Sequence, residues 1–235
     1  MIINGVSKID LQGEELWHRL KRMRILITIL LLYSFFFSPS LLNAEQSSWL
    51  LRKNLEGIPV YTRKVTGSPI LEFKANVIID APLPKVIAYF EKTQISRWYY
   101  QCVLSKFIEN DGPKQEVIYL ILHLPWPVAS RDFVFKRTRS KESAQGLISY
   151  TLTALPNRLP LVKGMIRVKS IESVWSFKSL PRDRTEMFFQ QHTDTAGSIP
   201  ASFVNAVVAD TPYYSLKNFR ELLTGKNVGH KRRIS

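Results

Sequence analysis

The sequence predicts an α+β fold in which a curved antiparallel sheet packs against one long C-terminal helix. Three observations support this fold class. Apolar and polar residues alternate with a period of two over about a hundred residues in the middle of the chain. Turn sequences such as NDGPK, SAQG and LPRDR separate the alternating segments, which indicates consecutive antiparallel strands. The last long segment changes to a helical repeat, and the inner side of a curled sheet needs such a helix to cover it.

The first 44 residues are predicted to be an N-terminal extension and a secretory signal peptide. A basic segment from Lys21 precedes an apolar run over 25–37, and the small residue Ala44 suits a cleavage site. The run has 13 residues, whereas a membrane-spanning helix needs roughly 20. We therefore expect an exported protein, periplasmic or secreted, with an uncleaved hydrophobic anchor as the alternative. Both Met1 and Met23 are candidate start residues, and the acidic residues between them are atypical of a signal peptide.

Composition favours one domain that folds without a metal or a disulfide. The chain has 235 residues, 45% of them hydrophobic, and its one cysteine, Cys102, has no partner within the chain. Without residues 1–44 there remain 28 basic and 16 acidic side chains, a net charge of +12. This charge favours transient contact with an anionic membrane surface, and a solvated basic surface without a specific partner is the alternative. The domain is expected over 45–224, followed by a basic disordered tail over 225–235.

The elements before the alternating region are two helices and one strand. Residues 47–57 read as a short amphipathic helix that begins at serines and ends at Gly57. Alternation then predicts a half-buried strand over 71–79. Pro84 suits the start of a second helix, whose apolar residues Val86, Ile87 and Phe90 recur at helical spacing.

Six strands are predicted in the alternating region, over 101–109, 115–123, 132–140, 147–154, 168–179 and 184–193. In the fifth, one face carries Ile171, Ser173, Trp175 and Phe177.

A long helix is predicted to close the domain. Ser198 can cap it, Pro200 suits its first turn and Gly225 suits its end. Pro212 is expected to kink it. Its apolar stripe, which we expect to face the sheet, comprises Ile199, Phe203, Ala206, Val207, Leu216, Phe219, Leu222 and Leu223, with Asp210 at the same spacing.

Two segments resemble the START lipid-transfer domain family. In PWPVASRDFVF, a proline-rich turn leads to Arg131 and Asp132 at the start of a central strand. The closing GSIPASFVNAVVADTPYYSLKNFREL is similar to the family's last helix, including Asn205 and the kink at Pro212. The resemblance covers roughly 48–224 and the order of elements. It implies a helix-grip fold of the START-like or Bet v 1-like kind, in which the sheet wraps around the final helix and encloses a hydrophobic tunnel.

The resemblance implies a lipid or another hydrophobic small molecule as ligand, for transfer or for sensing. An apolar interior suits such a ligand because each buried methylene group contributes about 0.8 kcal/mol. By residue type alone, aromatic stripes are also compatible with a filled core that leaves no cavity. The ligand-binding candidates are Trp98, Arg131, Trp175, Phe177, Phe203, Ala206, Val207 and Asp210.

Arg131 and Asp132 are predicted to form an ion pair at the mouth of the cavity. The guanidinium group of Arg131 could anchor a phosphate or carboxylate headgroup, since its fork of donors matches such oxygens. The alternative is a purely structural role that ties the strand to a neighbouring turn.

The loop over 155–165 is a candidate gate that meets the membrane during lipid exchange. Prolines and Gly164 keep it irregular, and apolar residues lie between cations that suit lipid phosphates. An ordinary loop over the core is the alternative. The gate candidates are Arg158, Leu159, Leu161, Val162 and Lys163.

No catalytic residue, cofactor or metal site is predicted. His123 and His192 lie in strands without cysteine or carboxylate at metal-ligand spacing, and no nucleophile elbow or phosphate-binding loop occurs. One alternative is a cyclase-like or hydratase-like helix-grip enzyme that uses His192 or Asp210 inside the cavity. Another is an accessory binding module with a filled core. Nucleic-acid binding is not expected because the sequence lacks a recognised motif, and the oligomeric state is open.

Overall fold

The computed structural model describes residues 48–110, 114–124, 128–194 and 199–225, together with Lys21 and Met23. The predicted signal peptide, the capping role of Ser198 and the basic tail beyond Gly225 lie outside these residues. Within the described ranges, no helix is both long and apolar enough to cross a bilayer.

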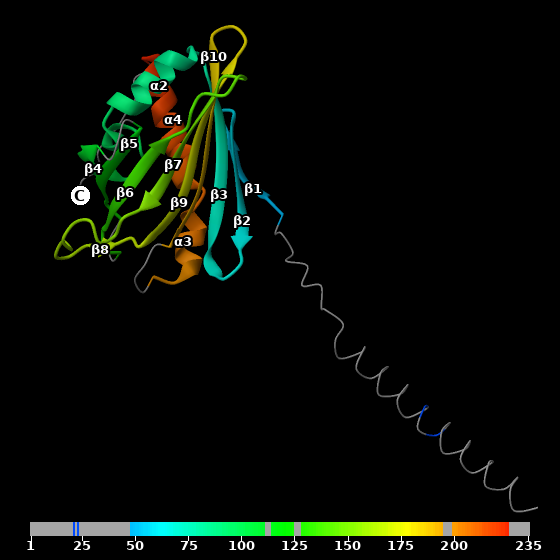
Figure 1. Ribbon diagram of the computed structural model, residues 1–235, viewed down its shortest axis with the longest axis vertical. Helices are drawn as coiled ribbons and strands as arrows, with labels where there is room; N and C mark the ends of the chain where they lie inside the picture. The colour runs from blue at the N-terminus through cyan, green and yellow to red at the C-terminus, as the bar shows by residue number, and fades with distance from the viewer. Residues whose placement is uncertain are drawn as a thin grey trace, which may run out of the picture. The chain divides into compact units, whose positions relative to one another are not determined.

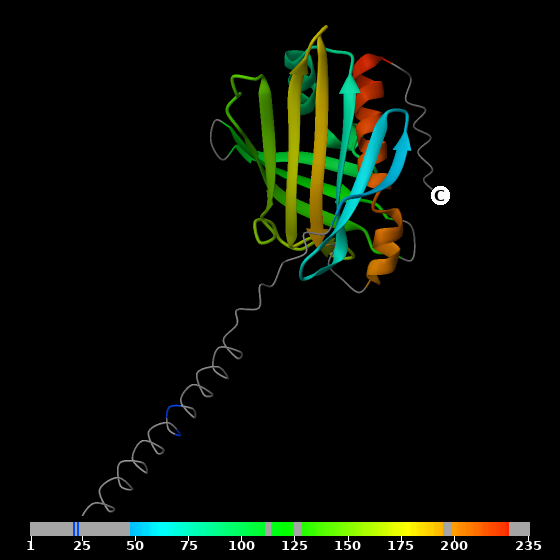
Figure 2. The same cartoon turned by 90° about the vertical axis from the view of Figure 1, so that its right-hand side faces the viewer.

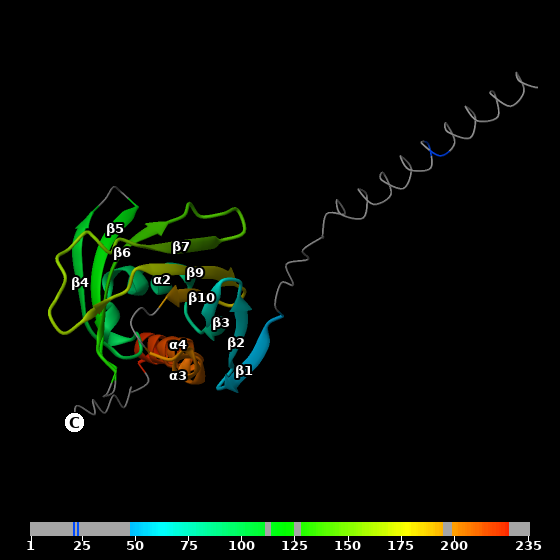
Figure 3. The ribbon, with the colours of Figure 1, turned by 90° about the horizontal axis from the view of Figure 1, so that it is seen from below.

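One ten-stranded sheet dominates the domain, in the order β1-β2-β3-β10-β9-β7-β6-β5-β4, with β8 paired to β6 (Figure 1). Among the described residues, the paired strands are antiparallel except for the short parallel β6–β8 pair. The sheet curves around the C-terminal helices, which lie against its inner face (Figures 2 and 3). The strands are β1 Leu50–Leu55, β2 Ile58–Val65, β3 Ser68–Ile79, β4 Cys102–Asn110, β5 Gln115–Leu122, β6 Arg131–Arg139, β7 Leu147–Ala154, β8 Ile166–Arg167, β9 Ser170–Leu180 and β10 Arg184–Asp194.

The helices are α2 Leu83–Lys92, η1 Ile95–Arg97, α3 Ala201–Val207 and α4 Asp210–Thr224. The predicted second helix and the six predicted strands of the alternating region correspond to α2 and to β4, β5, β6, β7, β9 and β10. The predicted inner face of β9 is buried as expected. The predicted α+β helix-grip class is therefore confirmed, and the two-residue strand β8 is the one element of this region that the alternation did not indicate.

The prediction of a helix over 47–57 is wrong, because this segment contains strand β1. Its leucines do not form a buried helical stripe: Leu50, Leu51 and Leu55 are all more than half exposed. Glu56 and Gly57 both have positive φ angles, of 52° and 72°, which suits the two-residue turn of a hairpin. The backbone of β1 therefore finds its hydrogen-bond partners in β2, and this pairing overrides the local helical pattern.

The predicted final helix is interrupted at Val208 and Ala209, which separates α3 from α4. Pro212 lies in the first turn of α4 and lacks the N–H that would bond to the carbonyl of Val208, so the break falls where the expected kink places it. The second half of the apolar stripe is buried as expected, at Leu216, Phe219 and Leu223.

The first half of the predicted stripe does not face the sheet. Phe203 is 69% exposed, Val207 is 57% exposed and Ala206 is also exposed. Helix α3 is instead held by Asn205, whose side chain accepts a hydrogen bond from Leu71 N and donates one to Pro69 O, both at 2.9 Å. This pair of hydrogen bonds orients α3 with its larger apolar side chains outward.

The β1–β2 hairpin contacts α4 through Lys53 and Glu56. Lys53 Nζ lies 2.5 Å from Asp210 Oδ1 and over the rings of Tyr213 and Tyr214. Burial lowers the pKa of Lys53, but the hydrogen bond and charge of Asp210 outweigh this and raise the pKa above its usual value. At the hairpin turn, Glu56 accepts hydrogen bonds from Lys217, Tyr213 and Arg220 of α4.

Both edge strands of the sheet are irregular. The β1 register shifts between Leu51 and Lys53. The β4 register shifts twice, between Cys102 and Leu104 and between Phe107 and Glu109.

Candidate ligand-binding cavity

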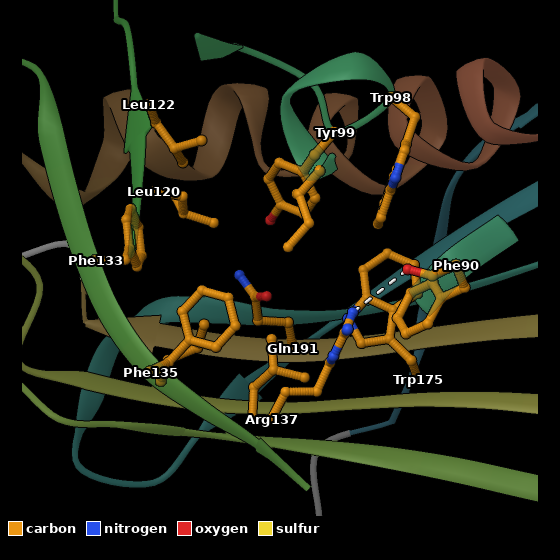
Figure 4. Close-up of a pocket in the computed structure, with 13 residues that line it drawn as sticks. Phe90, Trp98, Tyr99, Leu120, Leu122, Phe133, Phe135, Arg137, Trp175 and Gln191 are labelled. Atoms are coloured by element: carbon orange, nitrogen blue, oxygen red, sulfur yellow. Dashed lines mark hydrogen bonds between the residues drawn. The ribbon is translucent and has the colours of Figure 1, made fainter. Parts of the chain in front are cut away.

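A cavity of about 30 Å³ lies between the inner face of the sheet and the segment that contains η1 (Figure 4). Its lining is almost wholly apolar. The 13 lining residues are Phe90, Ile95, Trp98, Tyr99, Leu120, Leu122, Phe133, Phe135, Arg137, Leu152, Ile171, Trp175 and Gln191.

Interlocked aromatic rings close one end of the cavity. Phe90 of α2 is at their centre, with its ring centroid 4.9 Å from Tyr150 and 5.6 Å from Trp175. Trp175 in turn stacks on Phe189 with the ring centroids 3.5 Å apart. This end is therefore filled by the protein's own side chains, and we call it the aromatic end.

The opposite end of the cavity is lined by residues of β5 and β6. Leu120, Leu122, Phe133 and Phe135 lie at this end in Figure 4, away from Trp98 and Trp175. We call it the open end, because Leu122 is partly exposed there.

Arg137 is the cation in the lining, and it is 5% exposed. Its Nε donates to Glu116 Oε2 at 2.8 Å, and Nη2 donates to the same oxygen. Nη1 donates to Phe90 O at 3.4 Å, and the guanidinium lies over the rings of Phe90 and Tyr150. The Glu116 carboxylate neutralises this charge, so the lining presents an ion pair and not a free cation.

Tyr99 and Gln191 supply the neutral polar groups of the lining. The Gln191 side chain points towards Tyr99 in Figure 4. Burial raises the pKa of Tyr99 far above its usual value, and hydrogen bonding to Gln191 lowers it by a smaller amount. The Tyr99 hydroxyl therefore stays protonated and can act as a hydrogen-bond donor.

Trp98 and Trp175, both predicted ligand-binding residues, line the cavity. Phe177 is fully buried beside Phe90, with the ring centroids 4.8 Å apart, and is not in the lining. Phe203, Ala206 and Val207 are exposed on α3, and Asp210 is engaged with Lys53. The structure thus brings two of the eight predicted residues to the cavity, and the ligand contacts themselves stay a prediction.

The predicted ion pair of Asp132 has a different partner. Asp132 Oδ2 lies 2.7 Å from Arg167 Nη2, and both residues are buried. Arg131 is 2% exposed, its Nη1 donates to Ala129 O, and it is not in the cavity lining. The contact with Ala129 matches the structural alternative, in which Arg131 ties the strand to the preceding turn.

The candidate gate loop over 155–165 is held at its base by Arg167. The guanidinium donates to the carbonyl oxygens of Pro156, Leu159 and Pro160, at 2.6, 3.1 and 3.0 Å. Arg158 pairs with Glu109 at 2.5 Å, so this predicted membrane cation is engaged with the protein. None of the loop's residues lines the cavity. Leu161 is 77% exposed, so the loop can still contact a membrane, and that role stays a prediction.

The structure places His192 away from the cavity. Its Nε2 lies 3.0 Å from Ser68 Oγ, and the residue belongs to the face of β10 opposite to Gln191. Asp210 is likewise outside the lining. The enzyme alternative therefore loses both side chains named for it inside the cavity. Across the described ranges, no three His, Cys, Asp or Glu side chains are grouped closely enough to hold a metal ion.

Sequence reasoning missed Tyr99, Arg137 and Gln191 as lining residues. A signal for two of them was present, because Arg137 and Gln191 share the inward positions of Phe135 and Phe189 along their strands. Tyr99 follows η1 and carries no such periodic signal.

A curved antiparallel sheet that wraps around a C-terminal helix and has an apolar cavity on its inner face defines the helix-grip class of domains. Within that class, the chain belongs to the START domain family, whose model matches residues 40–224. The resemblance read from the sequence is thus confirmed.

Relatives and solved structures agree with this assignment. An uncharacterized Pseudomonas aeruginosa protein is 32% identical over 179 residues, which cover 76% of this chain and 88% of the relative. The phosphatidylcholine transfer protein of Rattus norvegicus is 24% identical and covers 71% of this chain and 78% of its own. The crystal structure of a STAR-related lipid transfer protein from Xanthomonas axonopodis is similar with a TM-score of 0.69 and 32% identity, covering 75% of this chain and 98% of that one.

Proposed function

We propose that the domain binds a lipid or another hydrophobic small molecule in the cavity and transfers it between membranes or senses it. The observation that carries the proposal is the apolar cavity between the inner sheet face and the helical segment. The similarity to proteins named for lipid transfer supports it. Burial in such a cavity offsets the free-energy cost of leaving a membrane, since removing a chain of sixteen carbons from water is worth on the order of 13 kcal/mol.

Loading requires a rearrangement. The cavity of about 30 Å³ accommodates about one water molecule, whereas ligand pockets span roughly 300–1,000 Å³. Helix α3 is the element best suited to move, because it contributes no fully buried residue and is separated from α4 by the break at Val208 and Ala209. We propose that α3 moves outward to admit the ligand.

We further propose that one end of the domain contacts anionic membranes. Helix α3 and the 155–165 loop lie at the same end in Figures 1 and 2. Phe203 and Val207 on α3, and Leu161 and Val162 in the loop, are exposed apolar side chains that suit insertion at a lipid interface. Lys163 beside them is exposed and suits lipid phosphates. The signal peptide predicted over the first 44 residues would add export to the same proposal.

An accessory binding module is the second candidate, and the small cavity volume favours it. Such a module would recognise its partner through the outer face and keep its interior filled. The two functions make different predictions for the purified protein: a lipid-binding domain retains a lipid, and an accessory module with a filled interior does not.

Organic-solvent extraction followed by mass spectrometry tests the proposal. We expect about one equivalent of a lipid per domain from protein purified without detergent, and faster movement of labelled lipid between vesicles when the protein is added. Protein that yields no lipid, binds no added amphiphile and leaves vesicle exchange at its spontaneous rate would favour the accessory module.

A further inference from the structure

The inner face of the sheet carries one transverse row of polar residues. Strand register pairs Glu116 of β5 with Arg137 of β6, Arg137 with Leu152 of β7, Leu152 with Ser173 of β9 and Ser173 with Gln191 of β10. Partners in register project from the same face of the sheet as neighbours. We call these five residues the polar row, although Leu152 within it is apolar.

The polar row divides the cavity into two unlike ends. The next row on one side includes Tyr150, Trp175 and Phe189, which belong to the aromatic end, besides Arg139 of β6, which pairs with Glu91. On the other side, Phe135 and Ile171 lie two positions before Arg137 and Ser173 on their strands, and both line the open end of the cavity. Because stacked rings fill the aromatic end, an alkyl chain can extend from the polar row in one direction only.

Besides Thr193 Oγ1, one inward position beyond Gln191 on β10, two buried polar atoms near this row have no hydrogen-bond partner among the described residues. They are Ser173 Oγ, on a residue 4% exposed, and Trp98 Nε1, on a residue 2% exposed. Trp98 lines the cavity, with its ring centroid 5.5 Å from that of Trp175. Buried polar groups in folded proteins are usually paired. The two atoms therefore point to a ligand group that accepts a hydrogen bond from the indole and pairs with the hydroxyl.

The electrostatics of the row favour a ligand group without charge. The Arg137 guanidinium is matched by the Glu116 carboxylate, and the other polar groups of the lining, Tyr99, Gln191 and the indole of Trp98, are neutral. Ser173, which is buried beside Gln191 in the polar row but is not in the lining, is neutral as well. A buried anion would need a positive counter-charge, and the cation of this lining, Arg137, is already paired with Glu116. A hydroxyl, ester or amide group needs only the hydrogen bonds that the lining offers.

We propose that the cavity binds a single-chain amphiphile with a neutral polar group, which enters polar end first. The polar group lies at the polar row beside Gln191, Ser173 and Trp98, and the chain runs along the open end past Phe135 and Leu122. This inference rests on the proposed function and narrows its ligand to one chemical class.

Two probes of equal chain length test the inference on the full, delipidated chain. Titration of 1-palmitoylglycerol and of palmitate at pH 8, followed by intrinsic tryptophan fluorescence, gives both affinities. We expect the neutral probe to bind at least tenfold more tightly. The variant Gln191→Leu removes an amide from the polar row at similar volume, and it should weaken binding of 1-palmitoylglycerol about fivefold to tenfold.

Gln190→Leu is the matched control, because Gln190 precedes Gln191 on β10 but lies on the outer face and contacts Glu72 at 2.5 Å. It should leave the affinity unchanged, and circular dichroism checks that both variants fold. Palmitate bound as tightly as the neutral probe, or Gln191→Leu with unaltered affinity, overturns the inference and leaves lipid binding intact. If neither probe nor phosphatidylcholine vesicles deliver a ligand to the unmodified protein, the proposed function fails as well.

Discussion

Arg167 is the residue on which the 155–165 loop depends most. It is the ion-pair partner of buried Asp132 and the donor to three loop carbonyls. The sequence did not indicate this pairing, because Arg167 follows Asp132 by 35 positions and lies in a segment without periodic pattern. Adjacent Arg131 was the obvious candidate instead, yet neighbouring residues of a strand point to opposite faces.

Arg167→Met should therefore destabilise the domain by about 3–5 kcal/mol, because it leaves the Asp132 carboxylate buried without a counter-charge. Urea unfolding followed by circular dichroism measures the loss. Arg158→Met in the same loop is the control, and it should cost less than about 1 kcal/mol because the pair with Glu109 is exposed. Equal effects of the two substitutions would contradict this account of the loop.

Cys102 offers a test of burial at a single atom. Burial raises the pKa of its thiol to about 12, with smaller opposing contributions from hydrogen bonding to the backbone of Leu104 and Ile121. A raised pKa leaves the thiol protonated at neutral pH, and only the thiolate is nucleophilic. We expect Ellman's reagent to react slowly with the folded protein at pH 8 and at the rate of a free thiol in denaturant. Rapid reaction in the folded state would show that Cys102 is accessible.

At the scale of elements, the alternation of apolar and polar residues predicted most strands of the sheet. The sequence located the strands of eight to eleven residues in the alternating region closely, such as β5 and β10. It failed at β1, whose leucines mimic a helical stripe, and at α3, whose apolar residues face outward. Both failures concern surface elements, where the periodicity of apolar residues no longer reports burial in the core.

The attachment of α3 can be tested through Asn205. Asn205→Ala removes both hydrogen bonds to the β3 backbone and should lower stability by about 1 kcal/mol. Its local effect should be larger: we expect the Leu71 amide, which donates to Asn205, to exchange with deuterium several-fold faster. Ser202→Ala, an exposed position on the same helix, is the control. An unchanged exchange rate at Leu71 would mean that other contacts hold α3.

The loop tip carries a separate prediction about membranes. Leu161→Asp should reduce sedimentation of the protein with anionic vesicles several-fold without changing its stability, since the side chain is largely exposed. Leu147→Asp, at the other end of strand β7 from the loop, is the matched control. If both variants bind vesicles like the unmodified protein, the loop has no part in membrane contact.

For the whole molecule, the order of the later elements and the closing position of the helix were predictable, whereas the state of the interior was not. Large apolar residues such as Trp175 and Phe189 occur both in filled cores and in the walls of ligand tunnels, so their presence in the sequence does not distinguish the two. Only their packing shows that one end of the cavity is closed. Periodicity assigns a side chain to a face, and it does not say how much space remains between faces.

Ligand binding should stabilise the entire domain. A ligand present at 100 times its dissociation constant adds about 2.7 kcal/mol, which corresponds to a rise in Tm of about 5–10 °C for a domain of this size. Thermal unfolding of delipidated protein with and without 1-palmitoylglycerol measures the shift. A constant Tm over a range of saturating concentrations would argue against an internal site.

The register shifts in β1 and β4 affect how molecules of this protein meet one another. A regular outer strand would offer free amide and carbonyl groups to a second copy, and extended fibres could grow from such contacts. The register shifts in the edge strands β1 and β4 interrupt this regular row of hydrogen-bonding groups. We therefore expect concentrated solutions to remain free of β-rich aggregates, even though β1 and β4 both carry exposed apolar side chains.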